Sequence, residues 1–169
     1  AGVLKRVDYS YIKGGGITEA DQWRLNSNFS GSGTLTSNLE RVDGTLQGYL
    51  NSGTGMSQSS GVFTFPSTGI WEVIATFELD SQTNASYMDG QIEATSDNSS
   101  YADVALARGG HAGNTGADDR GSFTCSTILD ITDTSNHKVR FVVDNTGGVT
   151  VGSSTINRTH FTFTRLGDT

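Results

Sequence analysis

The residues that most often carry catalysis or bind metals are few in this sequence, and their spacing assembles no site. None of the three histidines, His111, His137 and His160, stands at a zinc-type spacing from another histidine or from Cys125. Acid–base catalysis needs a base and its partners clustered in one pocket, and no Gly-x-Ser-x-Gly turn connects a strand to a helix. We therefore expect a protein without enzymatic activity, cofactor or resident metal.

One loop, residues 109–121 (GGHAGNTGADDRG), holds several side chains of the type that bind ions. His111, Asn114, Asp118 and Asp119 could join backbone carbonyls around Ca²⁺, which prefers oxygen ligands. These side chains lack a fixed ligand spacing, so we favour a solvated loop at one end of a β-sandwich.

The single cysteine, Cys125, lies within an apolar alternation formed by Phe123, Cys125, Leu129 and Ile131. This pattern indicates a buried, reduced thiol. Because no internal disulfide is possible, stability must come from the core, from association, or from both.

Apolar residues alternate with period two along much of the chain after residue 61, which predicts strands. The clearest run is residues 69–79 (GIWEVIATFEL), where every second side chain is apolar. Similar runs recur about every ten residues with polar turns between them, and no helical pattern follows residue 25. We therefore predict an all-β fold, a jelly-roll β-sandwich of about eight to ten antiparallel strands with a short N-terminal arm. The aromatic residues expected in its core are Phe65, Trp71, Phe77, Phe123, Phe141, Phe161 and Phe163.

The N-terminal third gives weaker signals. Residues 1–16 end in three glycines and resemble an arm with a hinge, and Thr18 and Asp21 have the spacing of a capping box that could start one helical turn. Residues 26–60 suggest edge strands and loops. We therefore divide the chain into an arm and edge segment, 1–60, for attachment or orientation, and a jelly-roll head domain, 61–169.

The charge balance disfavours two classes of partner. The chain has 11 basic and 18 acidic side chains, a formal charge of −7, and no basic run. We expect no nucleic-acid binding. No stretch reaches the roughly 18 apolar residues of a membrane span, and the N-terminus has no signal-peptide core, so we expect no membrane and synthesis in a cytoplasm.

Four segments in order resemble the globular head of complement C-one-q and its tumour-necrosis-factor-like relatives. They are residues 61–71 (GVFTFPSTGIW), 120–129 (RGSFTCSTIL), 138–142 (KVRFV) and 154–163 (STINRTHFTF). The resemblance covers residues 61–169 and implies a jelly roll whose corresponding sheet packs around a threefold axis.

The N-terminal part resembles another group. Residues 17–25 (ITEADQWRL), 28–31 (NFSG) and 53–63 (GTGMSQSSGVF) are similar to segments of marine tailed-phage and cyanophage proteins, where they precede a head of the same type. This resemblance implies a virion structural protein, made in the host cytoplasm and located on the capsid surface or an appendage. It would be a capsid decoration, head-fibre or knob-like component. The alternative is a module on a tail appendage that binds a host-surface glycan or protein.

Partners follow from this interpretation: a second and third copy of the chain, and the major capsid or other virion proteins. Lys5, Arg6, Tyr9 and Tyr11 are candidates for virion attachment through ring burial and charge. A strand added to the edge of the sandwich is an equally good interpretation of these four residues.

Apolar side chains also occur on the strand faces opposite the predicted core. They predict a homotrimer interface whose candidate residues are Ile70, Ile74, Val142, His160 and Thr162. The alternative is that the N-terminal 60 residues fold back across the sheet and cover Ile70 and Ile74.

Overall fold

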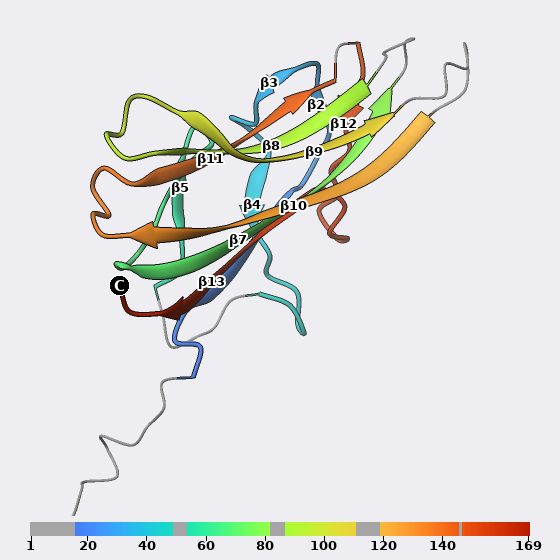
Figure 1. Ribbon diagram of the computed structural model, residues 1–169. Coiled ribbons are helices and arrows are strands. Elements are labelled where there is room, and N and C mark those ends of the chain that lie inside the picture. The colour runs from blue at the N-terminus through green and yellow to red at the C-terminus, as the bar shows by residue number, and fades with distance from the viewer. Residues whose placement is uncertain (1–15, 49–53, 82–86, 111–118, 146) are drawn as a thin grey trace, which may run out of the picture.

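The computed structural model describes residues 16–48, 54–81, 87–110, 119–145 and 147–169, which form two antiparallel β-sheets packed face to face (Figure 1). Sheet A contains β1 (Ala20–Leu25), β2 (Phe29–Ser30), β4 (Leu39–Arg41), β7 (Gly69–Ser81), β10 (Asp119–Ile131), β12 (Val149–Thr150) and β13 (His160–Gly167). Sheet B contains β3 (Gly33–Thr34), β5 (Ser57–Ser59), β6 (Val62–Thr64), β8 (Tyr87–Thr95), β9 (Ala102–Gly110) and β11 (Lys138–Asp144). The predicted all-β sandwich is confirmed. No helix in these residues is long and apolar enough to cross a membrane.

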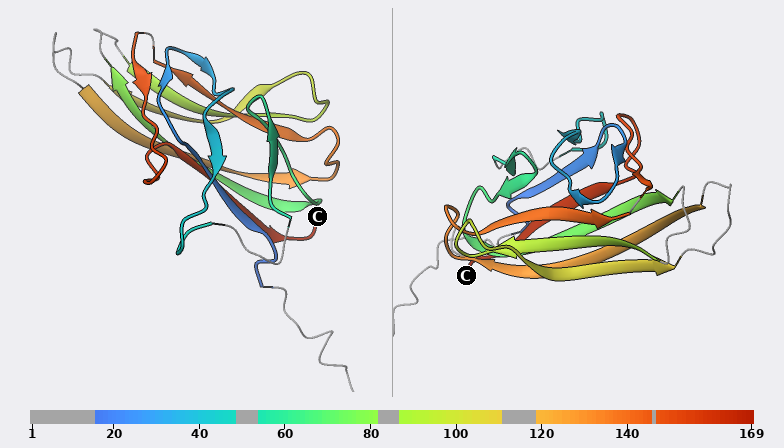
Figure 2. Two further views of the ribbon diagram at one scale, coloured as in Figure 1. Left: turned by 180° about the vertical axis from the view of Figure 1, so that it is seen from behind. Right: turned by 90° about the horizontal axis from the view of Figure 1, so that it is seen from above.

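Strands that are distant in sequence lie side by side in both sheets. In sheet A, β7 pairs with β10 on one side and with β13 on the other, and β1 lies between β13 and β4. In sheet B, β11 lies between β6 and β8, and β9 forms the edge. This order of non-local pairs is the jelly-roll arrangement. The β9 and β10 edges meet on one side of the sandwich, while the strands coloured blue to teal gather on the other (Figure 2).

The core occupies the space between the sheets, where the alternating apolar side chains point. On β7, Trp71, Val73, Ala75, Phe77 and Leu79 are at most 1% exposed, as their period-two spacing predicts. Six of the seven predicted core aromatics are equally buried: Phe65, Trp71, Phe77, Phe141, Phe161 and Phe163.

Phe123 differs from that prediction because it is only partly buried. It lies on β10, an edge strand of sheet A, and its ring covers Gly109 and Gly121. A Cβ atom at Gly109 would stand 1.8 Å from the Phe123 ring, so the close approach of this ring requires glycine there.

The alternation of Val104 and Leu106 on β9 suggests that both side chains face the core, but both face the solvent. Val104 and Leu106 are 41% and 44% exposed, while Ala105 and Ala107 pack against the core. The register between β8 and β9 shifts next to Ile92, because β9 carries one extra residue there. A β-bulge of this kind exchanges the two faces beyond it.

Residues 16–60 are more closely integrated into the sandwich than the division at residue 60 implies. The helical turn that the spacing of Thr18 and Asp21 could start does not form: residues 20–25 form strand β1, inside sheet A, because they hydrogen-bond to β13 and β4. Residue 60 itself lies in the turn between the paired strands β5 and β6. Strands β2, β4 and β5 lie at the edges of the sheets, and residues 1–15 lie outside the described residues.

The sandwich has two distinct ends. At one end the first and last described segments lie together, with the Arg165 amide donating to the Glu19 carbonyl at 2.9 Å. At the other end β7 finishes opposite the start of β10, and β8 starts opposite the end of β9 (Figure 1). We call these the terminal end and the distal end.

Candidate functional site

The outer face of sheet A, which points away from the core, carries an isolated group of aliphatic side chains. Ile70 and Ile74 project from β7, and Ile128 projects from β10. Ile128 lies diagonally between the other two, because Ile70 pairs with Asp130 and Ile74 with Ser126. We call these three residues the isoleucine triangle. Ile70 and Ile74 are half-buried, whereas Ile128 is 63% exposed.

Several polar side chains near the isoleucine triangle have partners within the sheet, and Glu72 lies between Ile70 and Ile74, opposite Ile128. Thr162 stands opposite Ile74, and its hydroxyl oxygen accepts a hydrogen bond from Gln22 Nε2 at 2.9 Å. The hydroxyls of Thr76 and Thr124 lie 3.0 Å apart across β7 and β10. Because these hydroxyls already have partners, covering them costs less than covering free polar groups.

His160 lies on the same outer face as Thr162, as predicted. Its Nδ1 is 3.3 Å from the Arg158 carbonyl, and its ring is half-buried. The structure thus brings together four of the five predicted interface residues: Ile70, Ile74, His160 and Thr162.

Val142 does not belong to this group. It lies on β11 in sheet B, between Gln91 of β8 and Thr34 of β3. Phe141 and Val143 face the core, so Val142 points outward from the opposite side of the sandwich. One flat interface cannot include both Val142 and Ile74, and the five-residue grouping is wrong on this point.

Strands β1 and β4 of the N-terminal 60 residues extend sheet A sideways, whereas β3 and β5 pair in sheet B. Strand β1 pairs with β13 edge to edge, and β4 continues beyond β1. These strands therefore lie beside β7 in the plane of the sheet and do not cross it. Residues 1–15 and 49–53 lie outside the described residues.

The other candidate residues fall mostly outside the described part of the chain. Within it, no group of three or more histidine, cysteine, aspartate or glutamate side chains is placed to hold a metal. Most of the 109–121 loop, with His111, Asn114 and Asp118, is outside the described residues, as are the attachment candidates Lys5, Arg6, Tyr9 and Tyr11.

Cys125 is buried on the inner face of β10, as its alternation predicts. Its side chain is 9% exposed, and its Sγ lies 3.8 Å from the Gly90 carbonyl oxygen. Burial raises the pKa of the thiol to about 11. The thiol is therefore protonated at neutral pH, which favours a packing role over a nucleophilic one.

Comparisons with known proteins place the fold. No family model and no curated protein matches the sequence. Among solved structures, Eiger TNF from S. frugiperda aligns with a TM-score of 0.70 and 11% identity over 89% of this chain and 93% of that one. Murine APRIL at pH 5.0 aligns with a TM-score of 0.63 and 11% identity over 88% and 98%. The chain has a TNF-like jelly-roll fold.

The TNF-like fold agrees with the resemblance seen in residues 61–169, and it extends the similarity into the N-terminal third. At 11% identity this likeness establishes the arrangement of strands, whereas function must be argued from the side chains. Sequence reasoning missed Ile128, although the signal was present: Ile128 precedes Leu129 and interrupts the polar face of β10 as Ile74 interrupts that of β7.

Proposed function

We propose that this chain is a non-enzymatic structural protein that assembles as a homotrimer through the outer face of sheet A. The observation that carries this proposal is the isoleucine triangle, whose member Ile128 is 63% exposed on a broad β-sheet face. Fully burying an aliphatic side chain contributes about 1.5–3 kcal/mol. The triangle is partly covered already, so each copy gains a fraction of that amount at each contact.

The threefold order comes from the resemblance to complement C-one-q heads, in which the corresponding sheet surrounds a threefold axis. A closed ring of identical contacts buries the same face on every copy and leaves none exposed. Val142 and Leu106 point from the outer face of sheet B, so they lie outside the proposed interface.

We expect the wild-type chain to have a trimeric mass by light scattering at micromolar concentration. Ile128→Asp and Ile74→Asp should reduce that mass to one chain, because each adds a carboxylate beside Glu72 in the contact. The matched control is Val142→Asp, which adds the same charge on the opposite sheet and should leave the mass unchanged. A monomeric wild type, or a trimer that survives both isoleucine substitutions, would contradict the proposal.

We further propose that the trimer belongs to a tailed-phage virion, as a capsid decoration, head-fibre or knob-like component. The supporting observations are the N-terminal resemblance and the two ends of the sandwich. The chain enters β1 at the terminal end, so residues such as Lys5 and Tyr9 would attach there to capsid or other virion proteins. The distal end would then project from the particle.

Antibody labelling of purified particles, viewed by electron microscopy, tests this location. We expect label at regular positions on the capsid or on an appendage. Particles that lack the protein, from a lysate in which the free protein is abundant, would overturn the virion assignment while leaving the trimer proposal intact.

A further inference from the structure

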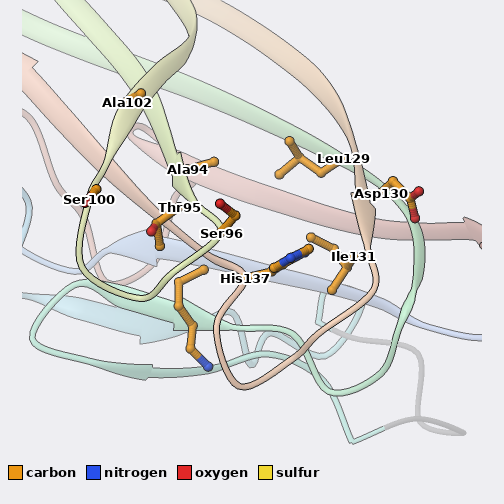
Figure 3. Close-up of a pocket in the computed structure, with 10 residues that line it drawn as sticks. Ala94, Thr95, Ser96, Ser100, Ala102, Leu129, Asp130, Ile131 and His137 are labelled. Carbon is orange, nitrogen blue, oxygen red and sulfur yellow. The ribbon is translucent and has the colours of Figure 1, made fainter.

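A cavity of about 340 Å³ opens where the β8–β9 and β10–β11 turns meet (Figure 3). Leu129 and Ile131 of β10 line one side, and Ala94 with Ala102 of the β8–β9 hairpin line the other. The two alanines stand opposite each other in the hairpin and are too small to fill the space between the sheets. The size is that of a small-molecule site.

The rim of the cavity is polar. Ser96 and Ser100 contribute hydroxyls from the β8–β9 turn, and His137 lies beside Ile131 (Figure 3). Lys138 also lines the cavity, and its Nζ donates to the Thr134 carbonyl at 2.6 Å. A serine hydroxyl and the His137 ring therefore stand above an apolar floor, while the Lys138 ammonium is held by the β10–β11 turn.

The nearby carboxylates either point away from the cavity or bind donors of the turns. Asp130 directs its carboxylate away from the cavity in Figure 3. In the β8–β9 turn, Asp97 Oδ1 accepts hydrogen bonds from the Ser99 and Ser100 amides at 2.9 and 2.7 Å, and these turn bonds hold the pKa of that carboxyl well below its usual range.

The carboxylate of the β10–β11 turn is engaged in the same way. Asp133 accepts from the Ser135 amide and from Asn136 Nδ2, at 2.8 and 2.7 Å. Asp97 and Asp133 thus satisfy turn donors and Asp130 points away, which leaves the rim suited to an anion.

We infer that this cavity binds a small aliphatic carboxylate. Its hydrocarbon chain lies against Ala94, Leu129 and Ile131, where it replaces water on apolar surface. Its carboxylate accepts hydrogen bonds from His137 and from the Ser96 hydroxyl at the rim. The same chemistry is presented by a free short-chain acid and by the C-terminus of a peptide that ends in an apolar residue.

Methyl NMR of the full chain, labelled at Leu and Ile, tests this inference with hexanoate as the probe. We expect saturable shifts of the Leu129 and Ile131 methyl signals. Hexan-1-ol and hexylamine carry the same chain with a neutral and a cationic end. Both should bind with an affinity at least about tenfold lower than that of hexanoate. N-acetylleucine distinguishes the sources: tighter binding than hexanoate assigns the site to a peptide C-terminus, and weaker binding assigns it to a free acid.

Two variants distinguish recognition of the carboxylate from occupation of the apolar cavity. His137→Gln should weaken hexanoate about tenfold and leave hexan-1-ol unchanged. Ala102→Leu, at the exposed rim, should block all the probes without unfolding the protein, as the unchanged methyl spectrum of the core would show. Hexanoate that leaves both methyl signals unmoved, or that binds no better than hexylamine, would overturn the inference.

Discussion

We expect replacement of Asp21 by alanine to lower the free energy of unfolding by about 3–5 kcal/mol. Asp21 is 2% exposed on β1, between the sheets. Its Oδ2 accepts hydrogen bonds from the Met56 amide at 2.7 Å, from Trp23 Nε1 at 3.0 Å and from Arg41 Nε at 3.1 Å. One carboxylate therefore joins β1, β4 and the segment that leads into β5.

Loss of this carboxylate would leave buried donors without partners, which is more costly than the loss of the bonds themselves. The Met56 amide and the Trp23 indole would both be affected, while Arg41 would keep its bond to the Met56 carbonyl and its position over the Trp23 ring. The destabilisation should therefore arise mainly from the two neutral donors and from the partly uncompensated guanidinium.

Urea unfolding followed by tryptophan fluorescence measures the effect. Asp43→Ala is the matched control, since Asp43 also pairs with an arginine, Arg24, but at 3.4 Å and with its side chain 86% exposed. That change should cost less than about 1 kcal/mol. If both substitutions lowered the free energy of unfolding equally, the hydrogen bonds to Asp21 would not be what holds the N-terminal strands to the sandwich.

A second large effect is expected in the aromatic core, where Phe161→Ala should cost about 3–5 kcal/mol. Phe161 is fully buried on β13 and stacks on Phe141 of β11, with ring centroids 3.6 Å apart and an interplanar angle of 7°. Its ring also contacts Phe63 and Phe77. It thus connects sheet A with sheet B at the centre of the sandwich.

The control for Phe161 is Leu166→Ala on the same strand, where the side chain is 49% exposed and little stability should be lost. Phe141→Ala, alone and combined with Phe161→Ala, completes a double-mutant cycle. The two losses should be less than additive, because either substitution removes the stacked pair. Fully additive losses would mean that the two rings contribute independently and that the stacking adds nothing.

Much of the fold was predictable because strand alternation is a local property of the chain. The residues from Trp71 to Leu79 show by their own order which side chains share a face, and all five inward ones are buried as expected. The same reasoning failed on β9, since one extra residue near Val104 exchanges the faces and leaves no local mark in the sequence.

The candidate interface was only partly predictable. Ile74 and Thr162 belong to strands that the alternation located, and each is correctly placed on the face opposite the core. The misplacement of Val142 had a different cause: alternation assigns a side chain to the inner or outer face of its strand, but not to one sheet or the other. That assignment depends on which distant strands hydrogen-bond, and β11 pairs with β8 and β6 rather than with β7.

The N-terminal strands show the limit most clearly. Thr18 and Asp21 have the spacing of a helix start, a local signal of small free energy. Residues 20–25 instead form β1, because pairing with β13 and the hydrogen bonds that the Asp21 carboxylate accepts stabilise the extended chain by more. Strands of two or three residues, such as β2 and β5, are too short to show any alternation.

The sequence by itself determined the fold class, the inward faces of the long strands other than β9 and the burial of Cys125, because each depends on the order of neighbouring residues. Only the tertiary structure decided the sheet to which each strand belongs, the grouping of Ile128 with Ile70 and Ile74, and the cavity beside His137. These features depend on contacts between residues far apart in the chain, and such contacts are selected by the free energy of the whole packed sandwich rather than by any single segment.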